Sequence, residues 1–304
     1  MAKQRGAVVV DRGFLPFLVP GLLLFAVVIA LPLTMNIGLS FTTWTGVGTP
    51  SWVGLDNYTR LVSDAAFWAS FRNILAMIVA MAIVPTVLGL FLASLLFDYV
   101  GKKLGDRPAS GLRAAFYLPQ VLPVAVAGVV WGWILHPTYG ALNLSLRTLG
   151  LDTLTRNWLG DHSTALLSVM AVMIWFQVGY PVVIFMAGLQ RVDPQLYEAA
   201  ELDGANWAQR FRHITVHMIR PEIFVVLLTT TIAALKVFGP IYVLTRGGPG
   251  NATNVPSYFA YQNFFERAQV GYGAAIATVL TLIVVVFSAL FLGAQSRDEL
   301  REAS

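Results

Sequence analysis

Few side chains in this sequence have types and spacings that could do chemistry. His213 and His217 are four residues apart, a helical spacing at which two imidazoles can chelate a metal ion. No third ligand is near them in the sequence, and arginines stand at positions 210, 212 and 220, so we expect no metal site. The chain has no cysteine, which excludes thiol catalysis and iron–sulfur clusters. We find no pairing of a nucleophile with a base, and we expect no enzymatic activity in this chain.

A glycine-rich segment, residues 247–250, is a second candidate site. A phosphate-binding loop of the G-x-x-x-x-G-K-[ST] type occurs nowhere in the chain, and no Lys-Ser/Thr follows this segment. We therefore expect no ATP site and no cofactor in this chain. A rigid turn that touches a partner or closes a gate explains the segment better, and its candidate residues are Thr245, Gly247, Gly248 and Pro249.

A third group of candidates consists of polar and aromatic residues inside apolar stretches. Lys236 is the single charge deep in such a stretch, where a charge costs at least ~2.5 kcal/mol, so it should face a cavity or a partner helix. Gln177 and Tyr180 are three residues apart and share a helix face. The set offers hydrogen bonds and flat apolar surfaces to a polyhydroxylated ligand, or it only bridges helices. Its members are Trp175, Gln177, Tyr180, Lys236, Phe238 and Tyr242.

The elements that must position these residues are membrane helices. Of the 304 residues, 57% are apolar and 12% are charged, against roughly 25% charged in soluble domains. A bilayer core of ~30 Å needs about 20 apolar residues in a helix. Six stretches qualify, which predicts an all-α integral membrane protein: Leu15–Ile37, Ile74–Phe97, Ala114–Leu135, Ala165–Leu189, Ile223–Leu244 and Ala274–Leu292.

The basic residues predict the orientation of these helices. Lysine and arginine are retained in short cytoplasmic loops, and 13 of them fall on one side of the predicted bundle against six on the other. Both termini are therefore expected in the cytoplasm. Because the basic residues lie in loops between apolar runs, they do not indicate nucleic-acid binding. Five of the six stretches contain proline. A moving or pore-lining bundle and ordinary kinking of membrane helices explain these prolines about equally well.

The loop over residues 191–222 has structure of its own. Asp193 and Pro194 read as an N-cap and first helical position, and Gly204 ends a helix over Pro194–Asp203. A second helix starts at Asn206 with a capping-box-like Gln209, and Pro221 ends it. The acidic residues of the first helix would be repelled by anionic lipid, so a protein partner explains this loop better than the membrane surface.

The same loop carries a family resemblance. The run Glu198-Ala199-Ala200, two residues, then Asp203-Gly204-Ala205 resembles the EAA loop of permease subunits of binding-protein-dependent ABC importers. Four further segments resemble the carbohydrate group of these importers, and within it the first permease of maltose-type systems. They are residues 53–58, 117–119 and 271–275 and the run Tyr242–Gly250. The resemblance covers residues 14 to 294, and it departs from the family at Val216-His217, where the family has Leu-Pro.

The resemblance implies a role for the loop and a set of partners. The docking residues for a cytoplasmic ATPase would be Glu198, Ala199, Ala200, Asp203 and Gly204. The chain would pair with a second permease, two ATPase subunits that hold ATP and Mg, and an extracytoplasmic sugar-binding protein. It would import a sugar or related polyol through a multi-pass domain of the inner or plasma membrane at residues 14–294, with cytoplasmic tails at 1–13 and 295–304.

Two other classes of protein compete with this interpretation. A self-sufficient secondary transporter or channel would use Lys236 as its ion-coupled or gating group. Such a protein needs no structured cytoplasmic dock and should transport when purified alone. A membrane-embedded enzyme would need polar catalytic clusters at the interface, which the sequence does not show.

Overall fold

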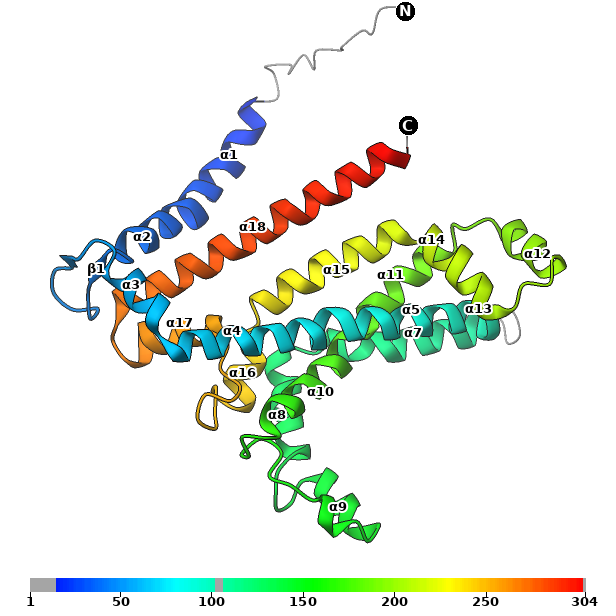
Figure 1. The fold of residues 1–304 in the computed structure, drawn as a ribbon, viewed down its shortest axis with the longest axis horizontal. Coiled ribbons are helices and arrows are strands. Elements are labelled where there is room, and N and C mark those ends of the chain that lie inside the picture. The colour runs from blue at the N-terminus through cyan, green and yellow to red at the C-terminus, as the bar shows by residue number, and fades with distance from the viewer. Residues whose placement is uncertain (1–14, 102–105, 303–304) are drawn as a thin grey trace, which may run out of the picture.

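The computed structural model describes residues 15–101 and 106–302, which form a bundle of helices (Figure 1). The label η marks a short π or 3₁₀ segment. In chain order the elements are α1 (Leu15–Phe25), η2 (Ala26–Ala30), α2 (Leu31–Leu39), β1 (Thr42–Thr43), β2 (Ser51–Trp52), α3 (Asp56–Ser63), α4 (Ala65–Ile78), η3 (Val79–Ile83), α5 (Val84–Leu95), η4 (Leu96–Gly101), α7 (Asp106–Val121), α8 (Val124–Ile134), α9 (Ala141–Thr148), η5 (Asp152–Leu154), α10 (Ala165–Gln177), α11 (Gly179–Leu189), α12 (Pro194–Leu202), α13 (Trp207–Arg210), η6 (Phe211–Thr215), α14 (Val216–Met218), α15 (Arg220–Leu235), α16 (Gly239–Leu244), α17 (Pro256–Tyr261), η7 (Gln262–Glu266) and α18 (Val270–Glu302). The two strands form a small antiparallel pair.

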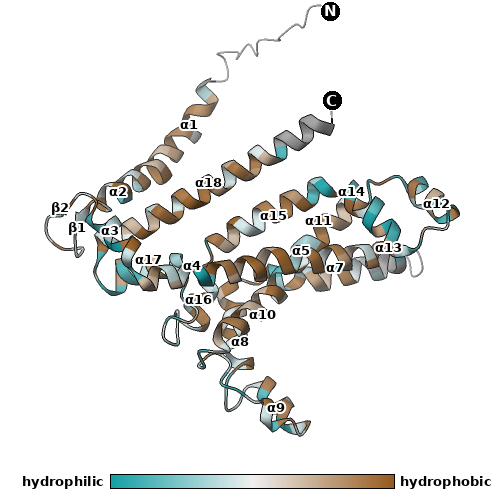
Figure 2. Cartoon of the chain, in the orientation of Figure 1, coloured by the Kyte–Doolittle hydropathy of each residue, from teal (hydrophilic) through white to brown (hydrophobic). Residues whose placement is uncertain are grey.

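Four helices in the described part of the chain are long and apolar enough to cross a membrane. They are Pro16–Leu39, Ala65–Asp98, Ala165–Leu189 and Val270–Gln295, and two further pairs of bent helices bring the number to six if each pair is one span. The predicted stretch Ala165–Leu189 is confirmed to the residue as one of these helices. Figure 2 shows hydrophobic residues along most of the long helices and hydrophilic residues around α12 to α14.

The third predicted stretch, Ala114–Leu135, is wrong as a single helix. It consists of two helices, Ser110–Val121 and Val124–Ile134, that meet at 94°. Pro123 lies at the bend with an extended ψ of 130° and caps the second helix. A proline disfavours helical geometry at the residue before it and donates no backbone hydrogen bond, so the helix stops at Val121.

The fifth predicted stretch, Ile223–Leu244, is also wrong as one helix. Its first part, α15, ends at Leu235, and α16 begins at Gly239 with Pro240 in its first turn. Proline is well suited to the first turn of a helix, so it starts a new helix here and does not merely kink the old one. Lys236 consequently caps the end of α15 at a break in the chain, and does not lie inside a continuous span.

The loop over residues 191–222 folds as a hairpin of helices. The second helix of this hairpin ends at Met218, before the predicted end at Pro221, and Pro221 instead lies in the first turn of α15. The helices Trp207–Met218 and Arg220–Leu235 meet at 71°. With Val216-His217 in place of Leu-Pro, the helix continues three residues past the π turn Phe211–Thr215 before it bends.

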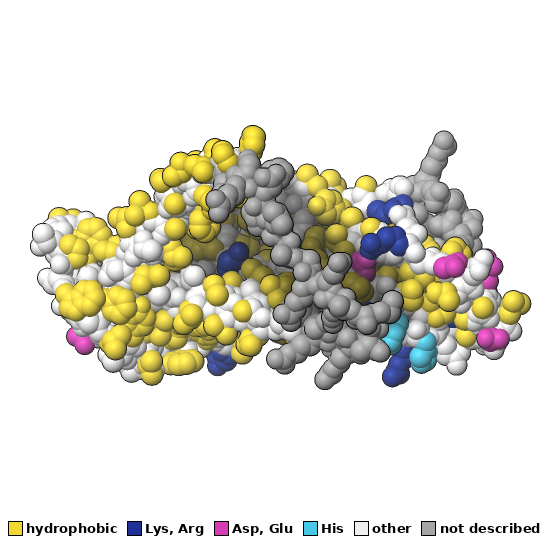
Figure 3. Space-filling view, turned by 90° about the horizontal axis from the view of Figure 1, so that it is seen from above, with side chains coloured by type: hydrophobic (Ala, Val, Ile, Leu, Met, Phe, Trp, Pro, Cys, Tyr) yellow, Lys and Arg dark blue, Asp and Glu magenta, His cyan; other side chains and the backbone are white. Residues whose placement is uncertain are grey.

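The buried residues form three clusters in the described part of the chain. One joins the hairpin to α5, α11 and α15 around Phe185, Leu189 and Ile219. A second lies between η3, α10, α15 and α17, and a third between α3, α4, α17 and α18. The helix Pro16–Leu39, by contrast, buries no residue of its apolar window. Figure 3 shows a face with broad hydrophobic surface, while charged and histidine side chains gather at the end formed by the hairpin.

Of the two predicted tails, the structure describes only the second, and that one in part. Residues 1–13, with Lys3, Arg5 and Arg12, lie outside the described residues, as do Lys102 and Lys103. Helix α18 continues to Glu302, so it includes most of the predicted tail 295–304. In Figure 1 the start of α1 and the end of α18 point away from α9.

Candidate functional site: a surface helix and the helix breaks behind it

The first helix of the hairpin, α12, has the caps that its sequence predicts. The Asp193 carboxylate accepts a hydrogen bond from the Gln195 backbone N–H at 2.9 Å, and Pro194 occupies the first turn. At the other end Gly204 has a φ of +80°, and the Ala205 N–H donates to the Ala200 carbonyl at 2.9 Å. A left-handed residue after the helix allows this closing hydrogen bond, which ends α12 sharply.

The predicted docking residues lie on α12 and in the turn that follows it. Glu198, Ala199, Asp203 and Gly204 are exposed, and Ala200 is half-buried. Because the two alanines have short side chains, another protein can approach the backbone closely between flanking carboxylates. The exposed face is therefore open to a partner.

Tyr197 anchors the opposite face of α12 and was missed by sequence reasoning. Its side chain is 5% exposed and packs in the cluster with Phe185 and Ile219. Its hydroxyl lies 3.0 Å from the Thr215 hydroxyl. Burial raises the pKa of the Tyr197 hydroxyl above its ordinary value of 10.0, so this group stays protonated at neutral pH. The only signal in the sequence was that Tyr197 is the single aromatic residue of this short helix.

The second helix of the hairpin makes polar contacts with the first helix and with the helix Ala65–Asp98. Asn206 and Gln209 form a reciprocal capping box, as their spacing predicts. The Arg210 guanidinium lies 3.0 Å from the Glu201 carboxylate of α12. The Trp207 indole N–H donates to the Asp98 carboxylate at 3.0 Å. The two helices of the hairpin are thus one unit that contacts the end of the helix Ala65–Asp98.

The predicted ligand-contacting residues are spread over two helix breaks. Gln177, 6% exposed, ends α10, and its Oε1 accepts a hydrogen bond from Gln120 Nε2 at 3.2 Å. Gln120 precedes the 94° bend between α7 and α8. Its own Oε1 is buried with no hydrogen-bond partner among the described residues. A buried carbonyl oxygen without a donor is a ready acceptor for a ligand hydroxyl or for water.

The structure does not bring Tyr180 and Trp175 together with Gln177. The Tyr180 hydroxyl lies 3.2 Å from Thr229 Oγ1 of α15, so this residue bridges two helices. Trp175 is 38% exposed and packs edge-to-face on Trp131, with ring centroids 5.4 Å apart. The two glutamines therefore face each other, while the tyrosine and the tryptophan contact other helices.

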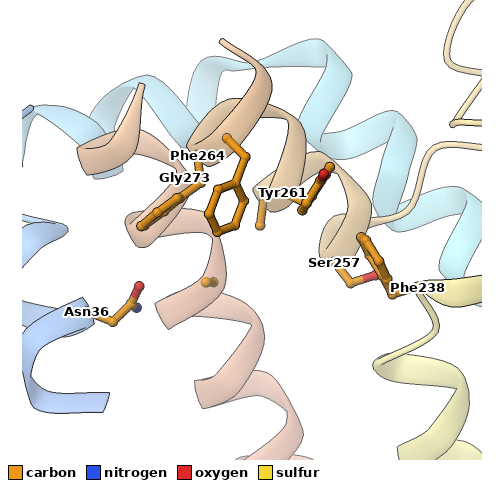
Figure 4. A pocket seen from close by; sticks show the side chains of 9 residues that line it. Asn36, Phe238, Ser257, Tyr261, Phe264 and Gly273 are labelled. Atoms are coloured by element: carbon orange, nitrogen blue, oxygen red, sulfur yellow. The ribbon is translucent and has the colours of Figure 1, made fainter. Parts of the chain in front are cut away.

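Lys236, Phe238 and Tyr242 lie at the second break, between α15 and α16. Lys236 is exposed, and no carboxylate lies within ion-pair distance of it in the described part of the chain. The rings of Phe238 and Tyr242 are stacked with their centroids 5.5 Å apart, and the ring of Tyr261 of α17 packs on both. Phe238 and Tyr261 also line a cavity of about 410 Å³ with Asn36, Ser257, Phe264 and Gly273 (Figure 4).

The glycine-rich segment forms a closed turn. Gly247 has a φ of +75°, and the Gly248 N–H donates to the Thr245 carbonyl at 2.9 Å. The Thr253 hydroxyl contacts the Thr245 hydroxyl at 2.7 Å and donates to the Gly248 carbonyl at 2.9 Å. These contacts hold residues 245–254, called the outer loop below, as one compact unit that includes Pro249.

The two histidines of the hairpin make no metal centre with their neighbours. His213 Nδ1 lies 2.9 Å from the Gln209 carbonyl. Within residues 15–101 and 106–302, no group of three His, Cys, Asp or Glu side chains lies close enough to hold a metal ion.

The family described as "Binding-protein-dependent transport system inner membrane component" matches residues 99–297, which include the hairpin, both helix breaks and the outer loop. The chain belongs to this family. It is a multi-pass permease subunit of the inner-membrane type, as the EAA-like run predicts.

Individual relatives agree with the family assignment, and a solved structure shares the fold. The permease is 38% identical over 273 residues to the probable ABC transporter permease protein YurN of Bacillus subtilis, covering 90% of this chain and 92% of that protein. It is 34% identical over 240 residues to the trehalose/maltose transport system permease protein MalF of Thermococcus litoralis, covering 79% and 78%. Its fold matches a chain in the crystal structure of a bacterial ABC transporter involved in alginate import, with a TM-score of 0.79, 22% identity and coverage of 93% and 94%.

Proposed function

We propose that this chain is a translocation subunit of an ATP-driven importer for a sugar or related polyol. The observation that carries the proposal is α12, a capped helix with an exposed Glu198-Ala199 face and a buried Tyr197 anchor, in a chain of the binding-protein-dependent permease family. Such a helix can receive force from a protein that binds its outer face. ATP and Mg would be held by that partner.

The complex would contain four further subunits. A second permease would complete the path, two ATPases would bind the hairpins, and an extracytoplasmic binding protein would deliver the substrate. The name of the Thermococcus relative and the family description support a sugar and a binding protein respectively. The extensive apolar surface of Pro16–Leu39 is available to lipid and to the second permease.

The substrate would pass along the two helix breaks. Gln177 and the unpartnered oxygen of Gln120 supply hydrogen-bonding groups beside the bend at Pro123. The aromatic rings at the second break supply flat apolar surfaces on which a sugar ring can stack. The proposed path is lined by Trp175, Gln177, Tyr180, Lys236, Phe238 and Tyr242, with Gln120 added by its contact with Gln177. The outer loop would close the path on the outward side.

Purification of the tagged chain from its native membrane tests this proposal. Mass spectrometry should identify a second six-span protein and an ATPase in the same complex. Ala199→Trp, on the exposed face of α12, should lose the ATPase and keep the second permease. Ala141→Trp is the control, because Ala141 is also exposed and lies on α9, far from the hairpin (Figure 1).

The contrary result has a definite meaning. Repeated recovery of the chain alone, with transport activity after reconstitution, would contradict the importer and favour a self-sufficient transporter or channel. Lys236, exposed at a helix break, would then be the residue to test first.

A further inference from the structure

One helix of this permease reaches from the cytoplasmic hairpin to the outer loop. The helix Ala65–Asp98 has 34 residues, so at 1.5 Å per residue it is about 50 Å long. Its turns are continuous through the π segment Val79–Ile83. In Figure 1 it runs from the neighbourhood of α17 to that of α13. It therefore lies alongside both segments that the proposed function assigns to opposite sides of the membrane.

The end of this helix near the hairpin carries a carboxylate. Asp98 accepts hydrogen bonds from the Trp207 indole at 3.0 Å and from Ser94 Oγ at 3.3 Å. The Trp207 ring also packs edge-to-face on the ring of Phe91, which belongs to the same helix, with ring centroids 5.9 Å apart. A hydrogen bond to a charged acceptor is stronger than one between neutral groups. The hairpin is thus attached to the helix Ala65–Asp98 through Asp98 and Phe91.

The other end of the helix carries a buried amide. Asn73 is 3% exposed, and its Nδ2 donates to the carbonyls of Asn251 at 3.3 Å and Asn254 at 2.9 Å. Both acceptors belong to the outer loop, which is itself held together by Thr253. Asn73 and Asp98 are roughly 38 Å apart along the helix axis. The helix therefore has one polar attachment to each of two distant segments.

The middle of the helix packs closely on a third functional element. A Cβ atom at Gly89 would lie 2.5 Å from Pro181 Cβ of α11, so the two helices approach each other as only glycine allows. Pro181 follows Gln177 by four residues in the helix Ala165–Leu189. A shift of the helix Ala65–Asp98 would consequently move the proposed substrate path as well as the outer loop, since close-packed side chains transmit displacement.

We propose that the helix Ala65–Asp98 couples the ATPase-docking hairpin to the outer loop, with Asp98 and Asn73 as the positioning residues at its two ends. This inference rests on the proposed function, because it assumes that an ATPase moves the hairpin. It assigns a role to two residues outside the hairpin and outside the substrate path.

A fluorescent reporter in the outer loop tests the coupling. The chain has no cysteine, so Ala252→Cys gives a single labelling site in this subunit. The labelled complex, purified with its partner subunits and placed in lipid nanodiscs, is treated with Mg-ATP and orthovanadate. We expect the emission of the label to shift in the parent. In Asp98→Ala, Trp207→Phe and Asn73→Ala the shift should be smaller by a factor of about five or more, while ATP hydrolysis continues.

Matched variants separate coupling from a general defect. Asn57→Ala removes another buried asparagine that donates to two backbone carbonyls, those of Ser40 and Thr42, both at 2.9 Å. Trp68→Phe removes an indole N–H that donates to Val62 at 2.8 Å. Both controls should keep the parent shift. The double variant Asp98→Ala/Trp207→Phe should show no larger defect than either single variant, because both act through one hydrogen bond.

The outcomes distinguish this inference from the proposed function. A parent complex that contains no ATPase overturns both. A complex that contains the ATPase and shows no shift with ATP and vanadate overturns only the coupling, because the importer proposal is tested by the presence of the ATPase. A parent that shifts, with shifts retained in the Asp98 and Asn73 variants, overturns only the role of this helix. Equal loss of hydrolysis and shift in these variants also overturns it, because coupling predicts that hydrolysis survives.

Discussion

The hydroxyl groups of Tyr197 and Thr215 lie 3.0 Å apart, beneath the helix that presents the exposed Glu198-Ala199 face. Through this contact α12 is held against the second helix of the hairpin, and the Tyr197 ring packs in the cluster formed with Phe185 and Ile219. The exposed face of α12, which we propose as the partner surface, is therefore backed by a hydrophobic core on its opposite side.

Tyr197→Phe and Tyr197→Ala should separate the hydrogen bond from the packing. Loss of the hydroxyl removes about 1 kcal/mol of stability, whereas loss of the buried ring removes about 3–5 kcal/mol. The melting temperature of the detergent-purified chain should fall slightly for the first variant and strongly for the second. Tyr139→Phe, at an exposed tyrosine, should melt like the parent. Equal melting of both Tyr197 variants would contradict this role.

Gly204→Val should uncouple ATP hydrolysis from uptake and leave the protein in the membrane. Gly204 has a φ of +80°, and a residue with a Cβ atom pays roughly 1–2 kcal/mol in that conformation. The turn after α12 should rearrange and shift the docking face. Uptake and hydrolysis are measured on the same reconstituted complex.

A matched glycine provides the control for that variant. Gly150 has a φ of +73°, and no described atom lies within 4 Å of a Cβ atom at either glycine. Gly150→Val should carry similar backbone strain on the far side of the molecule and keep coupling. Unchanged uptake in Gly204→Val at normal expression would refute the prediction.

Gln177→Leu should destabilise the chain more than the double variant Gln120→Leu/Gln177→Leu. The single change leaves the Gln120 amide near the bend without its partner, which costs about 1–3 kcal/mol, whereas two leucines remove both polar groups. If the pair also contacts substrate, the double variant should recover its melting temperature and still transport poorly. Recovery of both stability and transport would show that the glutamines only bridge helices.

Gly179→Ala should prevent close packing of α11 on α7. A Cβ atom there would lie 2.1 Å from the Phe116 carbonyl oxygen, and overpacking of this kind costs about 1–3 kcal/mol. The melting temperature and the yield of folded protein should both fall. Gly132→Ala is the control, since no described atom lies within 4 Å of its Cβ position. Parent-like stability of Gly179→Ala would show that the two helices can separate without cost.

The sequence alone determined the features that depend on neighbours along the chain. Apolar stretches of about 20 residues predicted membrane helices, and the stretch Ala165–Leu189 was confirmed to the residue. The caps at Asp193, Asn206 and Gly204 were predicted from local residue types, because each satisfies backbone groups within a few positions. The EAA-like run identified the family by the same local pattern.

Only the tertiary structure decided which distant groups meet and where the helices break. Proline inside an apolar run permits either a kink or a new helix, and packing selected a 94° bend at Pro123 and a new helix at Gly239. The contacts of Asp98 with Trp207 and of Gln120 with Gln177 join residues 109 and 57 positions apart. No periodicity along the chain encodes such pairs, because they form only when several helices have packed and the buried polar groups must find partners from whichever helix lies opposite.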